Sequence, residues 1–177
     1  MRNHYDESDV RRVIEQLAEK IRGEFTPAHP FNIVGVRTRG EALAERLSHL
    51  LRAAGYSNFG RGVLDITLYR DDLSEIGPRP LVRSTHLEIS IDNKPLLLVD
   101  DVCFTGRSAR SALDLLADFG RPSVIRFAVL VDRGGRELPI QPDFVGLTLR
   151  DVPRDHRVNV RLKETDGKDD ISVEPRS

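Results

Sequence analysis

The sequence lacks the residues on which several protein classes depend. Its one cysteine, Cys103, excludes a disulfide within the chain and suits a reducing cytoplasm. No apolar run approaches membrane-spanning length, and the N-terminus carries no signal-like apolar core. The five histidines are scattered and form no metal-ligand pair. We therefore expect a cytoplasmic protein with no membrane partner and no metal held directly by its own side chains.

An excess of charge of either sign is also missing. The chain has 27 basic and 28 acidic residues, which gives a formal net charge of −1. Global charge therefore does not draw the protein to nucleic acid, although a local basic patch stays open. The 177 residues suit one domain with a sizeable core. We predict a single domain over residues 1–177, with its core at about 10–165 and loose termini.

Apolar patterning predicts an α/β protein. Helical stripes alternate with short apolar runs of strand length, and Gly or Pro separates them. Ser8 or Asp6 is the expected cap of the first helix. Continuous apolar strands are typical of a parallel sheet covered on both faces. The predicted elements are helices with stripes over Val10–Ile21, Leu43–Ala54 and Ala109–Ala117, and strands at Phe31–Val36, Val63–Arg70, Leu96–Val99, Val124–Val131, Leu147–Leu149, Val158–Leu162 and Ile171–Val173.

One stretch, Pro95–Ser108, carries the clearest chemical pattern. Its apolar strand ends at Asp100 and Asp101, and Thr105-Gly106-Arg107-Ser108 then opens a helix. Unpaired N–H groups and the positive dipole end at a helix start suit a phosphate. The two carboxylates can accept hydrogen bonds from sugar hydroxyls or help to hold a cation. The pattern predicts a ribose-5-phosphate site. The simpler alternative is an ordinary strand–turn–helix in which Thr105 is a cap.

A second loop of the same kind lies one strand–helix unit earlier. Arg37-Thr38-Arg39-Gly40 follows an apolar strand and precedes a helix, so it combines two guanidinium groups with free backbone N–H groups. This predicts a second anion site, although surface arginines without such a role are common.

The segment after Arg70 resembles neither a helix nor a core strand. It begins with Asp71 and Asp72, contains Gly77-Pro78-Arg79-Pro80, and is too long for an ordinary connection. We interpret it as a lid or binding loop, with a disordered insertion as the alternative.

The Pro95–Ser108 pattern resembles the phosphoribosyl pyrophosphate (PRPP) motif of type I phosphoribosyltransferases. Three further stretches resemble one family within them, the PyrR family of pyrimidine operon regulators and uracil phosphoribosyltransferases: Leu64–Leu73, Ala128–Gly134 and Arg136–Ile140. The similarity runs from about Val10 to Val173. It implies the type I fold, which is a parallel sheet flanked by helices with a small hood from the C-terminal strands and the N-terminal segment, and a mobile β-ribbon loop.

The resemblance also implies a reaction, in which uracil and PRPP give UMP and pyrophosphate. Mg²⁺ is the implied cofactor and is held mainly by PRPP. A homo-oligomer, a dimer or larger, is implied as well. The implied catalytic residues are Asp100, Asp101 and Arg39. The implied contacts are Asp100 and Asp101 with ribose; Val102, Cys103, Phe104, Thr105, Gly106, Arg107 and Ser108 with the phosphate of PRPP or UMP; Arg37, Thr38, Arg39 and Gly40 with pyrophosphate, often through a cis non-proline peptide; Phe144 and Val145 with the base; and Arg70, Asp71 and Asp72 in the mobile loop.

The family's second activity is UMP-dependent binding of pyrimidine-operon mRNA, and here the sequence departs from the family pattern. Glu15, Gln16 and Glu19 replace Thr, Arg and His on the first helix. Each lost cation removes a phosphate contact, and added carboxylates repel the RNA backbone. We predict weak or absent RNA binding. The rival functions are an RNA-binding attenuation regulator that senses UMP, and a nucleotide-binding protein with negligible turnover. The other departures are Gly135, Gln141 and Leu147, whereas Arg133 and Arg136 are retained.

Overall fold

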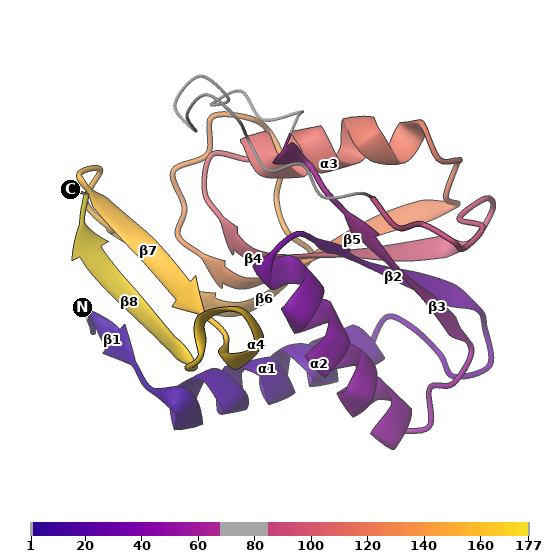
Figure 1. Ribbon diagram of the computed structural model, residues 1–177, viewed down its shortest axis with the longest axis horizontal. Coiled ribbons are helices and arrows are strands. Elements are labelled where there is room, and N and C mark those ends of the chain that lie inside the picture. The colour runs from indigo at the N-terminus through magenta and orange to yellow at the C-terminus, as the bar shows by residue number, and fades with distance from the viewer. Residues whose placement is uncertain (1, 68–84, 177) are drawn as a thin grey trace.

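The computed structural model describes residues 2–67 and 85–176, and within them the chain forms two sheets (Figure 1). The larger sheet has five strands, all parallel, in the order β3-β2-β4-β5-β6. The smaller, antiparallel sheet has the order β1-β8-β7. This arrangement confirms the predicted α/β fold with a hood. The five parallel strands are β2 (Phe31–Val36), β3 (Phe59–Leu64), β4 (Pro95–Cys103), β5 (Val124–Asp132) and β6 (Phe144–Thr148).

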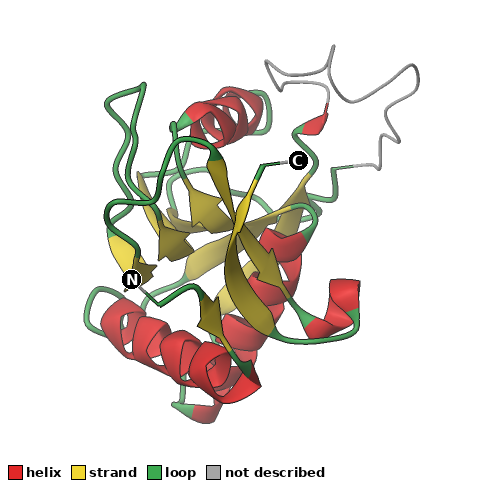
Figure 2. Ribbon diagram, turned by 90° about the vertical axis from the view of Figure 1, so that its left-hand side faces the viewer, coloured by secondary structure: helices red, strands yellow, loops and turns green. Residues whose placement is uncertain are grey.

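Helices cover both faces of the parallel sheet, as its apolar central strands require. Alternate residues of a strand point to opposite faces. In β4, Leu97 and Val99 pack into one core with helices α1 (Glu7–Arg22) and α2 (Arg39–Ala53). Leu96 and Leu98 pack into a second core with α3 (Arg107–Ala117). Figures 1 and 2 show the sheet between these two helical layers.

The start of α1 settles the choice between two predicted caps. Asp6 is the N-cap, and its carboxylate accepts a hydrogen bond from the backbone N–H of Asp9 at 3.0 Å. The Asp9 side chain accepts from the Asp6 N–H in return, which completes a capping box. Ser8 lies inside the first turn and donates its hydroxyl to Asp6.

Strand β3 begins four residues earlier than the sequence predicts. The sequence favours a strand over Val63–Arg70 because of its β-branched and aromatic residues, whereas β3 runs over Phe59–Leu64 and pairs in register with β2 from Phe31↔Phe59. The predicted and observed strands share Val63 and Leu64, and residues 68–70 of the prediction lie outside the described residues. The strand is hard to recognise in the sequence because it contains two glycines, and glycine is a poor strand former. The packing nevertheless requires one of them, because a Cβ on Gly62 would lie 2.5 Å from the Leu87 side chain.

The hood brings both ends of the chain together. Strands β7 (His156–Arg161) and β8 (Asp170–Pro175) form a hairpin, and β1 (His4–Tyr5) adds to the free edge of β8. The prediction of a loose segment over residues 1–7 is therefore wrong for His4 and Tyr5, whereas the predicted N-terminal part of the hood is confirmed. A short helix, α4 (Lys163–Asp166), lies in the hairpin connection, where the sequence indicated only a turn.

Two further predictions concern the lid and membrane-spanning segments. Arg70, Asp71 and Asp72, and most of the predicted lid, lie outside the described residues. Over residues 2–67 and 85–176, no helix is both long enough and apolar enough to cross a membrane.

Candidate functional site

The order of the parallel strands creates a crevice between β2 and β4. The chain passes from β2 outward to β3, then returns to the other side of β2 with β4 and continues to β5 and β6. The loops after β2 and β4 therefore diverge from adjacent strand ends, and ligands of open α/β sheets bind at such a switch point. The residues predicted to bind anions lie on these two loops.

Residues 37–40 form the first loop at this crevice. The Arg37–Thr38 peptide is cis, as the family resemblance implies. A Cβ on Gly40 would lie 2.5 Å from the Val99 carbonyl oxygen, so the glycine lets the start of α2 lie directly against β4. Arg37 donates from Nε to Glu41 at 3.1 Å. The structure thus brings the first loop to the end of β4, as predicted.

Arg39 of this loop is held by the hood. Its Nε and one terminal nitrogen donate to the two carboxylate oxygens of Asp166 at 3.0 and 2.6 Å. Asp166 also accepts from the backbone N–H of Leu162 at 3.0 Å. These hydrogen bonds raise the pKa of Arg39 and hold the pKa of the Asp166 carboxyl far below its usual range. The arginine therefore stays charged and has a fixed direction, with a second terminal nitrogen that these two bonds do not use.

The two carboxylates at the end of β4 have different surroundings. Asp100 is 8% exposed, and its Oδ1 accepts from the Asp101 N–H at 2.9 Å. Asp101 accepts from the Val102 N–H at 2.9 Å. Burial raises the pKa of the Asp101 carboxyl, while the nearby positive charge of Arg39 opposes that rise. Both acids lie next to the first loop, which agrees with a role in binding one ligand together with it.

Residues 102–108 form the second loop and lead into α3. Gly106 caps the helix with φ +91°, a left-handed conformation that favours glycine. Thr105 accepts from the Arg107 N–H at 3.3 Å, and Arg107 pairs with Glu137 at 2.8 Å. Cys103 is 3% exposed, and burial raises the pKa of its thiol to about 11, so this residue is structural. The N–H groups of a helix's first turn have no carbonyl partner inside the helix, which suits the predicted phosphate contact of this loop.

A further segment, residues 132–140, holds the second loop in place through hydrogen bonds. The N–H groups of Glu137 and Leu138 donate to the Thr105 carbonyl at 2.9 and 3.1 Å. Arg136 donates to the Phe104 carbonyl at 2.8 Å and forms an ion pair with Asp132 at 2.8 Å. Sequence reasoning did not identify this support, although the signal was present: Asp132-Arg133-Gly134 directly follows a buried strand, as Asp100-Asp101 does.

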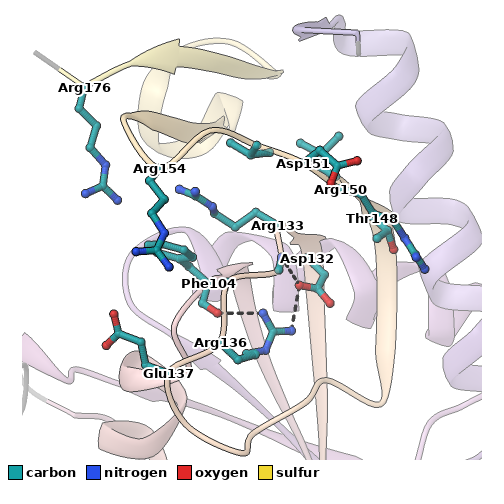
Figure 3. A pocket seen from close by; sticks show the side chains of 14 residues that line it. Phe104, Asp132, Arg133, Arg136, Glu137, Thr148, Arg150, Asp151, Arg154 and Arg176 are labelled. Atoms are coloured by element: carbon teal, nitrogen blue, oxygen red, sulfur yellow. Dashed lines mark hydrogen bonds and ion pairs between the residues drawn. The ribbon is translucent and has the colours of Figure 1, made fainter.

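A cavity of about 780 Å³ opens beside Phe104, at the carboxyl ends of β5 and β6 (Figure 3). Its two sides are the segment after β5, which includes Asp132 and Arg133, and the β6–β7 connection, which begins at Thr148. Phe104 lines the side of the cavity that lies next to the second loop. Gly135 permits this arrangement, because a Cβ there would lie 2.5 Å from the Phe104 ring. The cavity therefore continues the crevice toward the hood.

Phe144 and Val145 do not lie at this edge. Phe144 is the first residue of β6 and pairs with Ala128, whereas Thr148 pairs with Asp132 at the carboxyl end. Four residues of strand separate Phe144 from the edge, which is roughly 13 Å. Phe144 packs against the core of α1, and the Val145 carbonyl accepts from Lys20 at 2.7 Å. The structure thus places both residues with the core and α1, apart from the other predicted site residues.

The two arginines retained from the RNA-binding pattern are used inside the molecule. Arg133 is 7% exposed and donates to the His156 carbonyl at 3.1 Å. Arg136 donates to backbone carbonyls, as described above. On α1, Glu19 is exposed and pairs with Arg22 at 2.5 Å. The N–H groups of Arg133 and Arg136 are thus used within the fold, and the charge of Arg22 is paired with that of Glu19.

The acidic groups of the crevice do not make a complete metal centre. Over residues 2–67 and 85–176, no three or more His, Cys, Asp or Glu side chains gather in a way that could hold a metal ion. The adjacent pair Asp100 and Asp101 suits a cation whose other ligands come from a bound diphosphate and water.

Comparison with known proteins agrees with this geometry. Residues 3–161 match the family described as Phosphoribosyl transferase domain. The chain is 47% identical over 169 residues to the bifunctional protein PyrR of Desulfosudis oleivorans, covering 95% of this chain and 93% of that protein. It is 48% identical over 167 residues to the bifunctional protein PyrR of Chloroflexus aurantiacus, covering 93% and 90%.

Solved structures support the same fold at lower identity. A hypoxanthine phosphoribosyl transferase of Trypanosoma cruzi superposes with a TM-score of 0.73 at 18% identity, over 98% of this chain and 90% of that one. The HGPRT-ase from Leishmania tarentolae, solved in complex with GMP, gives a TM-score of 0.72 at 16% identity, over 99% and 97%. At these identities the likeness concerns the fold alone.

Proposed function

We propose, from the premise that this chain belongs to the PyrR family of phosphoribosyltransferases, that it transfers the phosphoribosyl group of PRPP to uracil and releases pyrophosphate. One observation carries the proposal. Two anion-binding loops, 37–40 and 102–108, lie side by side at the β2–β4 switch point, and Asp100 and Asp101 lie between them. PRPP has a phosphate at one end, a diphosphate at the other and a ribose between, so its groups match the three parts of the crevice.

The division of PRPP between the loops follows from their chemistry. The N–H groups and hydroxyls of Thr105–Ser108 suit the 5′-phosphate. Asp100 and Asp101 accept hydrogen bonds from the ribose hydroxyls. Arg39, held in one direction by Asp166, suits the diphosphate and stabilises the negative charge that grows on it as the glycosidic carbon becomes cationic. The protein's contribution is mainly positioning and electrostatic stabilisation.

Mg²⁺ fits this site as a partner of the substrate. The described residues offer two adjacent carboxylates and no three-ligand cluster. Asp100 and Asp101 are the side chains that would approach the ion, directly or through water. When bound, the ion supplies further neutralisation of the diphosphate.

The base would lie in the cavity beside Phe104 and not at Phe144 and Val145. The inner end of the cavity adjoins the carboxyl ends of β5 and β6, at Asp132 and Thr148. The Thr148 hydroxyl and the backbone groups that follow it can pair with the alternating donors and acceptors of a pyrimidine edge. This position also adjoins the second loop, as a base joined to a ribose requires.

The regulatory alternative has less support from the described residues. Arg133 and Arg136 are occupied by backbone carbonyls, and the exposed face of α1 carries Glu15 and Glu19. We infer that this protein binds UMP as a product and binds pyrimidine-operon RNA weakly. A homo-oligomer in the cytoplasm stays part of the proposal on family grounds.

The test is a turnover assay with PRPP, Mg²⁺ and a panel of nucleobases: uracil, cytosine, orotate, hypoxanthine and guanine. We expect PRPP-dependent formation of UMP from uracil, and much slower product formation from the other bases. The absence of any PRPP-dependent product, or a clear preference for another base, would contradict the proposal.

A further inference from the structure

Three arginines from separate segments line the cavity beside Phe104, and two of them, Arg133 and Arg176, approach its ring. Arg133 follows β5, Arg154 lies in the β6–β7 connection, and Arg176 directly follows β8. The guanidinium carbon of Arg133 lies 3.7 Å from the ring centroid, and that of Arg176 lies 5.8 Å from it. Figure 3 shows Arg154 and Arg176 reaching from the hood to the same side of the cavity as Phe104.

Within the described part of the chain, these arginines have no carboxylate partner. Two of the acids that line the cavity are already used, because Asp132 pairs with Arg136 and Glu137 pairs with Arg107. No ion pair joins any residue from 2–67 or 85–176 to Arg133, Arg154 or Arg176. The outer part of the cavity therefore carries a concentrated positive charge, although the chain as a whole is close to neutral.

Arg133 shows that this charge is not simply a solvated surface. Arg133 is only 7% exposed, and its Nε is buried with no hydrogen-bond partner among the residues that the structure describes. Burial and the neighbouring charge of Arg176 both lower its pKa. A buried cation without a counter-ion is costly, and a second cation beside it adds to the cost. An anion in the cavity would offset both.

A purely structural explanation accounts for only one of the three arginines. Arg133 donates to the carbonyls of His156 and Pro153 at 3.1 and 3.4 Å and stacks on Phe104, so it joins the hood to the second loop. That role needs neither Arg154 nor Arg176, and the charge of Arg176 repels that of Arg133. Their convergence is explained if a ligand brings the missing negative charge.

We propose that Arg133, Arg154 and Arg176 form a second anion site, which binds the polyphosphate group of a small molecule. Three guanidinium groups from three segments match a multiply charged phosphate chain better than a single carboxylate, because arginine binds phosphate through paired N–H groups. The cavity of about 780 Å³ has room for such a group at its outer end in addition to a pyrimidine at its inner end. This site is separate from the Thr105–Ser108 loop, which contacts the crevice on the other side of Phe104.

The probe for this site is inorganic triphosphate, titrated calorimetrically at low salt in the presence of saturating UMP. The variant is Arg154→Gln with Arg176→Gln, which keeps the buried Arg133. The matched control is Arg121→Gln with Arg157→Gln, two exposed arginines outside the cavity that change the net charge equally. We expect the wild type to bind two triphosphates per chain, one at the 37–40 loop and one in the cavity. The cavity variant should bind the second at least tenfold more weakly, and the control should change by less than twofold.

Three results would overturn the proposal. Equal weakening in both double variants would show attraction by overall charge alone. A single triphosphate per chain that is lost in Arg39→Ala would place the anion only in the substrate site. An RNA hairpin that loses affinity in the cavity variant, while triphosphate binding is unchanged, would assign the arginines to RNA. If UMP itself gives no binding heat, the proposed function fails, and the comparison of the two variants with triphosphate still decides this site.

Discussion

At the scale of single residues, Asp101 is a side chain whose effect on folding stability can be separated from its effect on ligand binding. Its carboxyl is partly buried at the end of β4, and burial raises its pKa. The carboxyl thus lies where burial disfavours its charged form. Such a residue is expected to contribute to ligand binding more than to folding.

We predict that Asp101→Asn weakens PRPP use by tenfold or more with little loss of stability. The amide retains the shape and an acceptor but not the charge, so the desolvation cost falls while the ribose contact weakens. The measurements are PRPP affinity and urea unfolding, with Asp114→Asn on the exposed side of α3 as a control. A variant that unfolds, but binds PRPP normally when folded, would show that Asp101 is structural.

Single residues also show where sequence reasoning succeeds and fails. Asp100, Asp101, Thr105 and Gly106 were found because one short stretch contains strand, acids, glycine and hydroxyl in order. The pairing of Arg39 with Asp166 spans 127 residues and depends on where the hood folds back, so no local pattern reveals it. Phe144 was assigned to the base by the family resemblance, and its register on β5, which places it at the start of β6 and away from the other predicted site residues, could not be read from the local sequence.

At the scale of elements, ion pairs join α2 to the hood. Arg39 bonds to Asp166, and Arg46 bonds to Glu164 and Asp169 at 2.6–2.8 Å. The carboxylates come from α4 and the turn after it, a stretch that the sequence showed only as polar. Strand β3 was likewise hard to predict because of its two glycines, whereas β2 and β5 were predicted to within one residue. For β4 the apolar part, Leu96–Val99, was predicted, but the strand continues to Cys103.

The Arg39–Asp166 pair predicts a pH dependence of stability. The pKa of Asp166 is lowered in the folded state, because Arg39 donates to its carboxylate. Its contribution is therefore present at pH values above its unfolded pKa of about 3.9 and is lost as the pH falls further. Asp166→Asn should lower the free energy of unfolding by about 1–2 kcal/mol at pH 7, and this difference should shrink toward pH 2.

Urea unfolding of the wild type and Asp166→Asn at pH 7, 5, 4 and 3 measures this effect. Asp114→Asn, an exposed residue of α3, serves as the control for a general change of charge. A difference between wild type and Asp166→Asn that stays constant over this range would show that the pair does not act through its charge.

At the scale of the whole molecule, the balance of charge bears on the question of RNA. The net charge is −1, and the exposed face of α1 carries Glu15 and Glu19 four residues apart, on one face of the helix. Three of the four cations on this helix have partners: Arg12 pairs with Asp9, Arg22 with Glu19, and Lys20 with the Val145 carbonyl, while the fourth, Arg11, is exposed. Among the described residues, the arginines gather in the cavity beside Phe104.

We predict weak, salt-sensitive binding to a pyrimidine-operon leader hairpin, even with saturating UMP. A mobility-shift titration at physiological and low salt checks this, with an unrelated hairpin as the control. The combined change Glu15→Thr, Gln16→Arg and Glu19→His should raise RNA affinity and leave uracil transfer unchanged. Sub-micromolar binding of the wild type, with clear preference for the leader hairpin, would sink this prediction.

The central claim is that the crevice divides PRPP between two loops, with the diphosphate on residues 37–40 and the 5′-phosphate on residues 102–108. The most direct test is calorimetric binding of PRPP and of UMP to Arg39→Ala, with Arg46→Ala as the control for loss of contacts to the hood. We predict that Arg39→Ala loses about 1.5–3 kcal/mol of PRPP binding, the value of a charge-assisted contact, while UMP binding is nearly unchanged because UMP has no diphosphate. Equal losses for PRPP and UMP would contradict the assignment.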